Sequence, residues 1–340
     1  MILMNTQRTW STFLLAVFMV LVGAACQAAI TQPSPIPTPA QPAATAMRTA
    51  QPAMGPTAPR LRGAPAAEPG TGGATLPDPT LFTVPWQERG IFRNGLIEQE
   101  QGILERLAGA SIYHIALAIS DDLTHVQGRQ ETLYTNIEDT PLAEIVFRLY
   151  PNLLGGSASV ANLTVNGQAT TPILALNDSA LHVPLAQPLL PGEPTVIAMD
   201  FAVVAPSGEG GSYSVFAYLE SIAALAHCYP IIAVYNDEGW QATIPEPYGD
   251  IIYADAAFYL VRITAPQDLT VVTSGVLIDK QEQDGQQVLT AAAGPARDFY
   301  LAASADYVVT SEQVGETTIN SYSLADWQGR AQRDGGANVR

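Results

Sequence analysis

Residues that could carry catalysis are scarce in this 340-residue sequence, and none stands in a known catalytic pattern. The histidines number four: His114, His125, His182 and His227. They do not form the His-Glu-x-x-His pair that places two imidazoles on one helical face for zinc. The Gly-x-Ser-x-Gly elbow, the phosphate loop and the dinucleotide fingerprint are also missing from the sequence. The residues themselves therefore predict no catalytic group and no metal ligand set.

The other reactive side chains have simpler interpretations. The paired acids Asp121-Asp122 and Glu138-Asp139 fall between expected strands, where solvated turns are the ordinary outcome. His114 and His125 are expected to be surface or half-buried histidines. Cys228 lies in an apolar stretch and is expected to pack as a small hydrophobic residue. Two cysteines in all allow one disulfide at most and exclude a four-cysteine zinc site.

The charge balance excludes one class of partner. The chain carries 15 Lys+Arg against 32 Asp+Glu, which gives a formal net charge of −17 at pH 7. A surface this negative repels phosphate backbones, so we expect no binding of nucleic acid.

Residues 1–26 have the organisation of an export signal. One positive charge, Arg8, precedes an apolar run at 13–22 that is shorter than the roughly 20 residues of a transmembrane helix. Small residues then lead to Cys26, as in a bacterial lipoprotein signal, although Gly23 stands where such signals prefer leucine. We expect lipidation of Cys26, with ordinary cleavage near residues 25–29 or an uncleaved anchor as alternatives. Each outcome places the chain outside the cytoplasm, in a bacterial cell envelope. Lipidation would anchor it to the membrane, facing outward.

Residues 27–80 consist mostly of Pro, Ala, Thr, Gly and Gln and have no periodic apolar positions. Such a segment cannot bury enough apolar surface to offset its ordering entropy. We expect a disordered tether, semi-rigid where it is rich in proline.

Residues 81–322 predict an all-β domain with one short helix at its start. Apolar positions recur at helical spacing between Asn94 and Leu107, and the period then changes to two at Tyr113–Ile119. Further strands are expected at 145–150, 163–167, 174–183, 195–204, 231–235, 258–264, 269–272, 299–303 and 317–322, with a hairpin at 276–289 that turns at Asp284-Gly285. This succession favours a large twisted antiparallel sheet or a sandwich. Residues 323–340 resemble the start of a helix that belongs to a following domain.

Several segments of this body form an ordered set: Tyr113–Ile119, 126–129, 134–136, Phe147–Asn152, Tyr229–Trp240, Gly249-Asp250, Tyr259–Pro266, Ser274-Gly275 and Ala296–Phe299. Together they resemble the amino-terminal domain of the aminopeptidase N-type zinc metallopeptidases, in the family's order. The resemblance implies a saddle-shaped β domain that precedes, and packs on, a thermolysin-like catalytic domain.

In that family the catalytic domain supplies a Gly-x-Met-Glu-Asn strand and a His-Glu-x-x-His helix. Zinc held there polarises a water, and the motif glutamate acts as the general base. Neither motif occurs in this sequence. The resemblance therefore implies that zinc belongs to the full-length family member and that this chain has no cofactor and is inactive alone. Its implied partners are the missing catalytic domain or the peptide substrate of the parent enzyme.

The family's β domain also lends an acid or amide to the pocket for the substrate's α-amino group, some eight or nine residues before an aromatic-Pro pair. The corresponding pair here is Tyr229-Pro230, and Glu220 lies nine residues before Tyr229. The resemblance thus implies Glu220 as the group facing the amine, against the alternative of an exposed loop glutamate.

Three hypotheses remain open at this point. The chain is part of a surface-anchored aminopeptidase, or a stand-alone envelope β domain that binds peptide or protein partners, or a tethered domain without a ligand. None of the three expects the chain alone to be an active peptidase. Its zinc content and its hydrolysis of alanyl amides test this expectation.

Overall fold

The computed structural model describes residues 79–208, 211–246 and 250–325. The predicted export signal with Cys26, most of the predicted tether and residues 326–340 lie outside these ranges. No helix among the described residues is both long enough and apolar enough to span a membrane.

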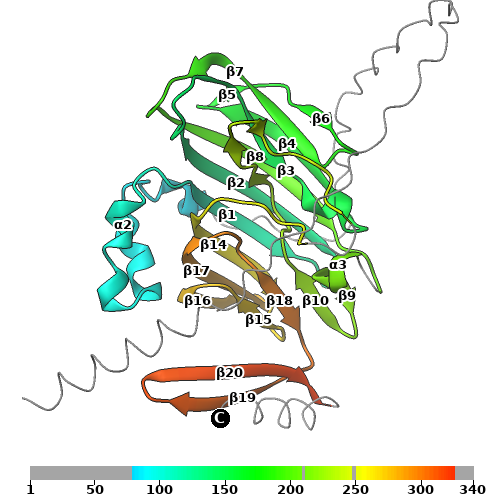
Figure 1. Cartoon of the computed structure of the whole chain (residues 1–340). Helices are drawn as coiled ribbons and strands as arrows, with labels where there is room; N and C mark the ends of the chain where they lie inside the picture. The colour runs from blue at the N-terminus through cyan, green and yellow to red at the C-terminus, as the bar shows by residue number, and fades with distance from the viewer. Residues whose placement is uncertain (1–78, 209–210, 247–249, 326–340) are drawn as a thin grey trace, which may run out of the picture. The chain divides into compact units, whose positions relative to one another are not determined.

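An eight-stranded sheet forms the centre of the described structure (Figure 1). Its strands in spatial order are β16 (Val276–Gln283), β17 (Gln286–Ala296), β14 (Ala257–Pro266), β1 (Ile112–Ile119), β2 (His125–Thr135), β8 (Pro194–Val204), β4 (Ser157–Val165) and β5 (Gln168–Ala169). The central strands β1 and β14 run parallel, with Ile112 opposite Phe258, and the other pairings of this sheet are antiparallel.

Four smaller antiparallel sheets complete the strands of the described residues. Two have four strands and two have two strands. They are β15 (Thr270–Thr273) with β18 (Leu301–Ser304), β10 (Ile222–Leu225) and β9 (Phe216–Leu219); β11 (Ile231–Ile232) with β3 (Leu142–Arg148), β7 (Ala180–Leu189) and β6 (Ile173–Ala175); β12 (Tyr235–Asn236) with β13 (Gly239–Trp240); and β19 (Tyr307–Val314) with β20 (Thr317–Leu324). The predicted all-β class is confirmed.

The helical segments are short. They are the 3₁₀ helices η1 (Pro79–Thr83), η2 (Arg89–Gly95), η3 (Glu98–Glu100) and η4 (Tyr150–Leu153), and the one-turn α-helices α2 (Ile103–Arg106) and α3 (Gly211–Ser214). The single helix expected between Asn94 and Leu107 is therefore interrupted. Gly95 ends η2, Ile97 is extended at ψ 150°, and Gly102 precedes α2. Glycine disfavours a helix interior, which explains why one continuous helix does not form here.

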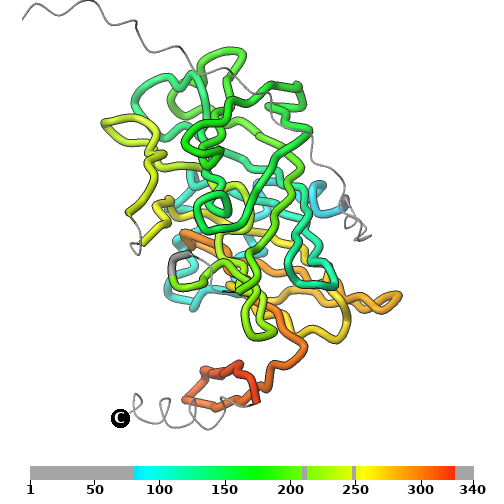
Figure 2. Tube along the Cα trace, turned by 90° about the vertical axis from the view of Figure 1, so that its right-hand side faces the viewer, coloured from blue at the N-terminus to red at the C-terminus, as the bar shows by residue number. Residues whose placement is uncertain are grey.

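Strand β1 is buried on both faces, whereas its alternating sequence predicted a half-buried strand. On one face Tyr113, Ile115 and Leu117 pack into the main core with the smaller sheets. On the other face Ile112 and Ala116 belong to a second apolar cluster, which residues of the N-terminal segment 79–110 complete. That segment lies beside β1 and β17, as both views show (Figures 1 and 2). The alternation of apolar residues did not reveal this covering layer.

One expected strand changes where the backbone turns, and one expected turn is confirmed. The segment 174–183, expected as one strand, divides into β6 and β7 because Leu176, Asn177 and Asp178 all adopt positive φ. Asn and Asp tolerate that conformation better than most residues, so the chain reverses there. The hairpin predicted at Asp284-Gly285 is confirmed, with φ of 54° and 78° at its two turn residues.

Strand β2 was not predicted as a strand, although its burial alternates perfectly along its length. Gly128 interrupts its apolar pattern. The ring of Phe201, its partner on β8, occupies the space that a side chain at Gly128 would need. A glycine in this position lets an aromatic ring approach the backbone closely.

We predict that Gly128→Ala lowers the free energy of unfolding by about 1–3 kcal/mol, because the added methyl overpacks the core. Its Cβ would meet the Phe201 ring and lie 2.8 Å from the Ala116 carbonyl oxygen. Urea unfolding followed by circular dichroism measures the change. The matched control is Gly102→Ala, whose Cβ meets only the flexible end of Arg106 at 3.3 Å and should leave stability unchanged or slightly raised. Equal effects of the two substitutions would contradict the prediction.

Candidate functional site

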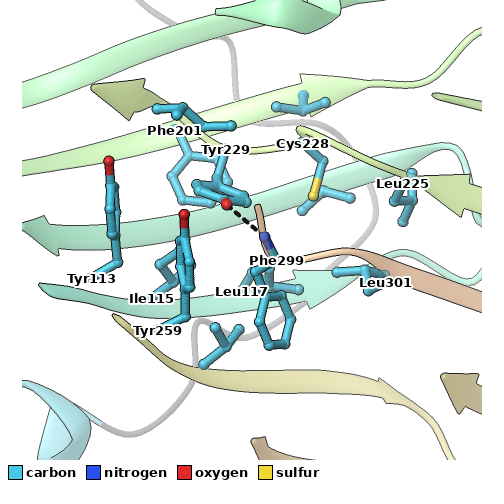
Figure 3. Close-up of a cluster of buried hydrophobic side chains, with 14 of the residues drawn as sticks. Tyr113, Ile115, Leu117, Phe201, Leu225, Cys228, Tyr229, Tyr259, Phe299 and Leu301 are labelled. Atoms are coloured by element: carbon cyan, nitrogen blue, oxygen red, sulfur yellow. Dashed lines mark hydrogen bonds between the residues drawn. The ribbon is translucent and has the colours of Figure 1, made fainter. Parts of the chain in front are cut away.

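Three tyrosines from distant parts of the chain stack in the main core (Figure 3). The ring of Tyr113 on β1 lies 5.0 Å from that of Tyr259 on β14, at an interplanar angle of 15°. Tyr229 meets both rings edge-on at 6.0 Å. Phe299 packs against Tyr259 at 6.2 Å. We refer to Tyr113, Tyr229, Tyr259 and Phe299 as the tyrosine cluster.

Hydrogen bonds fix this cluster to the backbone. The Tyr229 hydroxyl donates to Oδ1 of Asp298 at 2.8 Å and accepts from the backbone N–H of Phe299 at 2.9 Å. The Tyr113 hydroxyl accepts from the backbone N–H of Ile232 at 3.0 Å, across 119 residues of sequence. Each of these hydroxyl groups therefore satisfies a backbone donor that would otherwise be buried without a partner.

Burial sets the protonation state of the cluster. It raises the pKa of the Tyr113, Tyr229 and Tyr259 hydroxyls above the ordinary phenol value. Burial likewise raises the pKa of the Cys228 thiol, which is free and fully buried, so the expected hydrophobic packing of this residue is confirmed. These groups stay neutral at neutral pH, and a thiol in this state is a poor nucleophile.

One imidazole and one carboxylate lie at the rim of the cluster. His227 Nδ1 lies 2.7 Å from Asp298 Oδ2, in a geometry that does not make a hydrogen bond. His227 has a φ of 58°, and its ring lies 5.5 Å from that of Tyr150. The described residues offer no group of three His, Cys, Asp or Glu side chains that could hold a metal ion.

Arg148 at the end of β3 is the unusual charge of this region. The residue is only 3% exposed, and its Nη1 donates to the Thr243 carbonyl at 2.9 Å. Its Nε and Nη2 have no hydrogen-bond partner, and its Cζ lies 5.2 Å from the centre of the Tyr150 ring. Burial lowers the pKa of this guanidinium, and Tyr150 opposes that shift. The sequence analysis did not single out Arg148. Its position inside the apolar run 145–150 is the feature of the sequence that indicates a buried arginine.

His114 shows a different kind of burial. It is 1% exposed, not half-buried as expected, because Trp86 of the N-terminal segment stacks on its ring at 4.1 Å. Burial lowers the pKa of His114 to about 4, so the imidazole is neutral at neutral pH. It has no neighbouring ligand set and fills space in the second apolar cluster.

The predicted substrate-binding residue lies in a hairpin turn. Glu220 and Ser221 are the two turn residues of the β9–β10 hairpin, with φ of 50° and 65°. Glu220 is exposed, so its carboxylate is free to face a ligand or solvent. The predicted lipidation site, Cys26, lies outside the described residues.

Comparisons with known proteins give structural matches only. No family model matches this chain, and no curated protein does either. Among solved structures, the M1 zinc metallopeptidase from Deinococcus radiodurans matches at 18% identity and a TM-score of 0.42. A mutant two-domain M1 zinc metallopeptidase bound to L-tryptophan matches at 18% and 0.42, and one from D. radiodurans bound to a Tyr-Ser-Ala substrate at 18% and 0.41. Each match covers 63% of this chain and 46% of the other, so this chain spans less than half of theirs. At these scores the likeness by itself does not assign the chain to that family.

We predict that the domain loses its sheet structure as pH rises above about 10, the phenol pKa of the unfolded chain. A raised phenol pKa means that the folded state disfavours the phenolate. The stability from Tyr113, Tyr229 and Tyr259 is therefore complete below that pH and declines above it. Phenolate absorbance and circular dichroism, recorded together against pH, measure this coupling. Ionisation of every tyrosine near pH 10 with the sheet signal intact would contradict it.

Proposed function

We propose that residues 81–322 serve as the N-terminal β domain of a zinc aminopeptidase of the M1, or aminopeptidase N, type. The parent enzyme would release N-terminal residues from peptides. The observation that carries this proposal is the tyrosine cluster. Segments that gave the sequence its resemblance to this family, although far apart in the chain, contribute side chains that touch one another there.

The contacts support a shared structural role for those segments. Tyr113 and Tyr259 come from the two central strands, Tyr229 from the aromatic-Pro pair and Phe299 from the segment after β17. Four of the segments that carry the resemblance each place a side chain in this buried cluster, which a chance similarity of scattered short segments would not be expected to do. Similarity between separate strands does not by itself require their side chains to meet in one core.

The zinc chemistry would lie on a catalytic domain beyond the described residues. When bound, zinc of this type polarises a water and the scissile carbonyl. The β domain would support that domain and, through Glu220, face the α-amino group of the peptide. A carboxylate opposite an ammonium forms a charge-assisted bond, and the exposed hairpin tip leaves Glu220 free to make one.

The chain's location is part of the same proposal. Export through the signal at 1–26 and lipidation of Cys26 would anchor the domain to the envelope membrane, with residues 27–80 as a tether. The acidic composition suits a solvent-facing domain that avoids nucleic acid.

We predict that the purified 340-residue chain binds no stoichiometric zinc and does not hydrolyse alanyl amides. Atomic absorption and release of a chromogenic amine measure the two properties. The same chain, joined to a catalytic domain that carries His-Glu-x-x-His, should gain both. One tightly bound zinc ion together with turnover in the chain alone would overturn this prediction. A monodisperse chain that gains nothing from a catalytic domain would favour a stand-alone binding module.

In such a joined enzyme we predict that Glu220→Ala raises KM for an alanyl amide about tenfold or more, because a charge-assisted bond to the amine is lost. The control is Glu105→Ala, which removes an exposed glutamate of the N-terminal segment and should leave KM unchanged. An unchanged KM in Glu220→Ala would show that Glu220 does not bind the substrate amine. The proposed domain function would still be tested separately, by zinc content and turnover of the joined enzyme.

A further inference from the structure

We propose that Arg148 forms a carboxylate-binding subsite, in which the Nε and Nη2 edge of its guanidinium receives a carboxylate side-on. This inference goes beyond the peptidase proposal and requires neither zinc nor a catalytic domain. It rests on the hydrogen bonds, the burial and the charge around one side chain.

The unoccupied donors lie together on the guanidinium. Nη1 is held by the Thr243 carbonyl at 2.9 Å, whereas Nε and Nη2 have no partner. Nε and Nη2 form the edge of an arginine that offers two parallel N–H groups to the two oxygens of a carboxylate. The bond to Thr243 and the Tyr150 ring at 5.2 Å restrict the rotation of this fork. The side chain is therefore oriented in advance for bidentate binding.

The charge of Arg148 is not balanced inside the described structure. None of the ion pairs found among the described residues includes it. Two carboxylates of the described residues lie beside histidines instead, Asp298 beside His227 and Glu144 beside His182. A buried guanidinium with two unmet donors is strongly destabilising unless an anion compensates it. An anion from outside the domain supplies that compensation.

The cover over Arg148 is irregular backbone. Thr243 lies in the segment 241–246, which follows β13 and contains no strand. Beyond the Arg148 bond, this segment is held at its first residue, Gln241. The Gln241 N–H donates to the Val234 carbonyl, and its Nε2 donates to Asn236 Oδ1 and to the Gly239 carbonyl. Ile244 within it is 50% exposed. Displacing so lightly bonded a segment is the route by which a ligand reaches the guanidinium edge.

The ligand class follows from the single charge of the site. One guanidinium edge matches the two oxygens and single charge of a carboxylate. A doubly charged phosphate would keep one charge unmet in a chain of formal net charge −17. We therefore expect a carboxylate on a small organic acid or at the C-terminus of a peptide.

The test compares the melting temperature of the full chain in formate with that in chloride at equal ionic strength. The wild type should be stabilised, by about 3 °C at ten times Kd, and Arg148→Met should not respond. Arg129→Met is the matched control, because Arg129 is partly exposed and already paired with Glu131 at 3.0 Å, and it should respond like the wild type. Formamide, the neutral analogue, should have no effect on any variant.

A second ligand, a second variant and a spectroscopic signal extend this test. N-acetylglycine stabilises the wild type if the site accepts a peptide C-terminus, whereas formate alone does so if it accepts only small acids. If Arg148→Met does not fold, Arg148→Lys should fold and show a weaker response, because it keeps the charge but loses the fork. In the wild type, the ¹⁵N signal of the Arg148 Nε–H should shift with formate. An equal response of wild type and Arg148→Met, or no shift of that signal, overturns the proposal.

Discussion

The hydroxyl group of Tyr229 joins two segments of this domain that lie about 70 residues apart in the sequence. It is buried, so both its donor and its acceptor capacity have to be met within the protein. The Asp298 carboxylate and the Phe299 N–H meet them. The Tyr113 hydroxyl accepts a further bond from the backbone N–H of Ile232, close to Tyr229-Pro230. The position of the aromatic-Pro segment between the large sheet and the smaller sheets therefore depends on phenol hydroxyls as well as on apolar packing.

This arrangement separates neutral polar groups from charged ones. Inside the cluster, burial keeps the phenols and the Cys228 thiol uncharged, so they contribute hydrogen bonds and packing rather than acid–base chemistry. Charged groups such as Asp298 and Arg148 lie at its margin. The cluster therefore acts through packing and hydrogen bonding.

The sequence predicted the all-β class, the Asp284-Gly285 hairpin and the apolar packing of Cys228, because turn residues and period-two patterns act locally. It did not predict the burial of His114. That burial depends on Trp86, which lies outside β1 and reaches it only through the fold. Arg148 was missed for the same reason, since its isolation from carboxylates is a property of the packed structure. The tyrosine cluster was visible only as separate pieces of a family resemblance.

The parallel pairing of β1 with β14 has a consequence for the newly made chain. Ile112 cannot find its partner Phe258 until the ribosome has synthesised the chain as far as β14. Until then the edge of β1 that β14 will occupy stays open to water and to other chains. Late closure of the central sheet therefore delays folding until most of the domain has been made. The order of strands in this sheet therefore favours late folding, at the risk of aggregation for as long as the edge of β1 stays open.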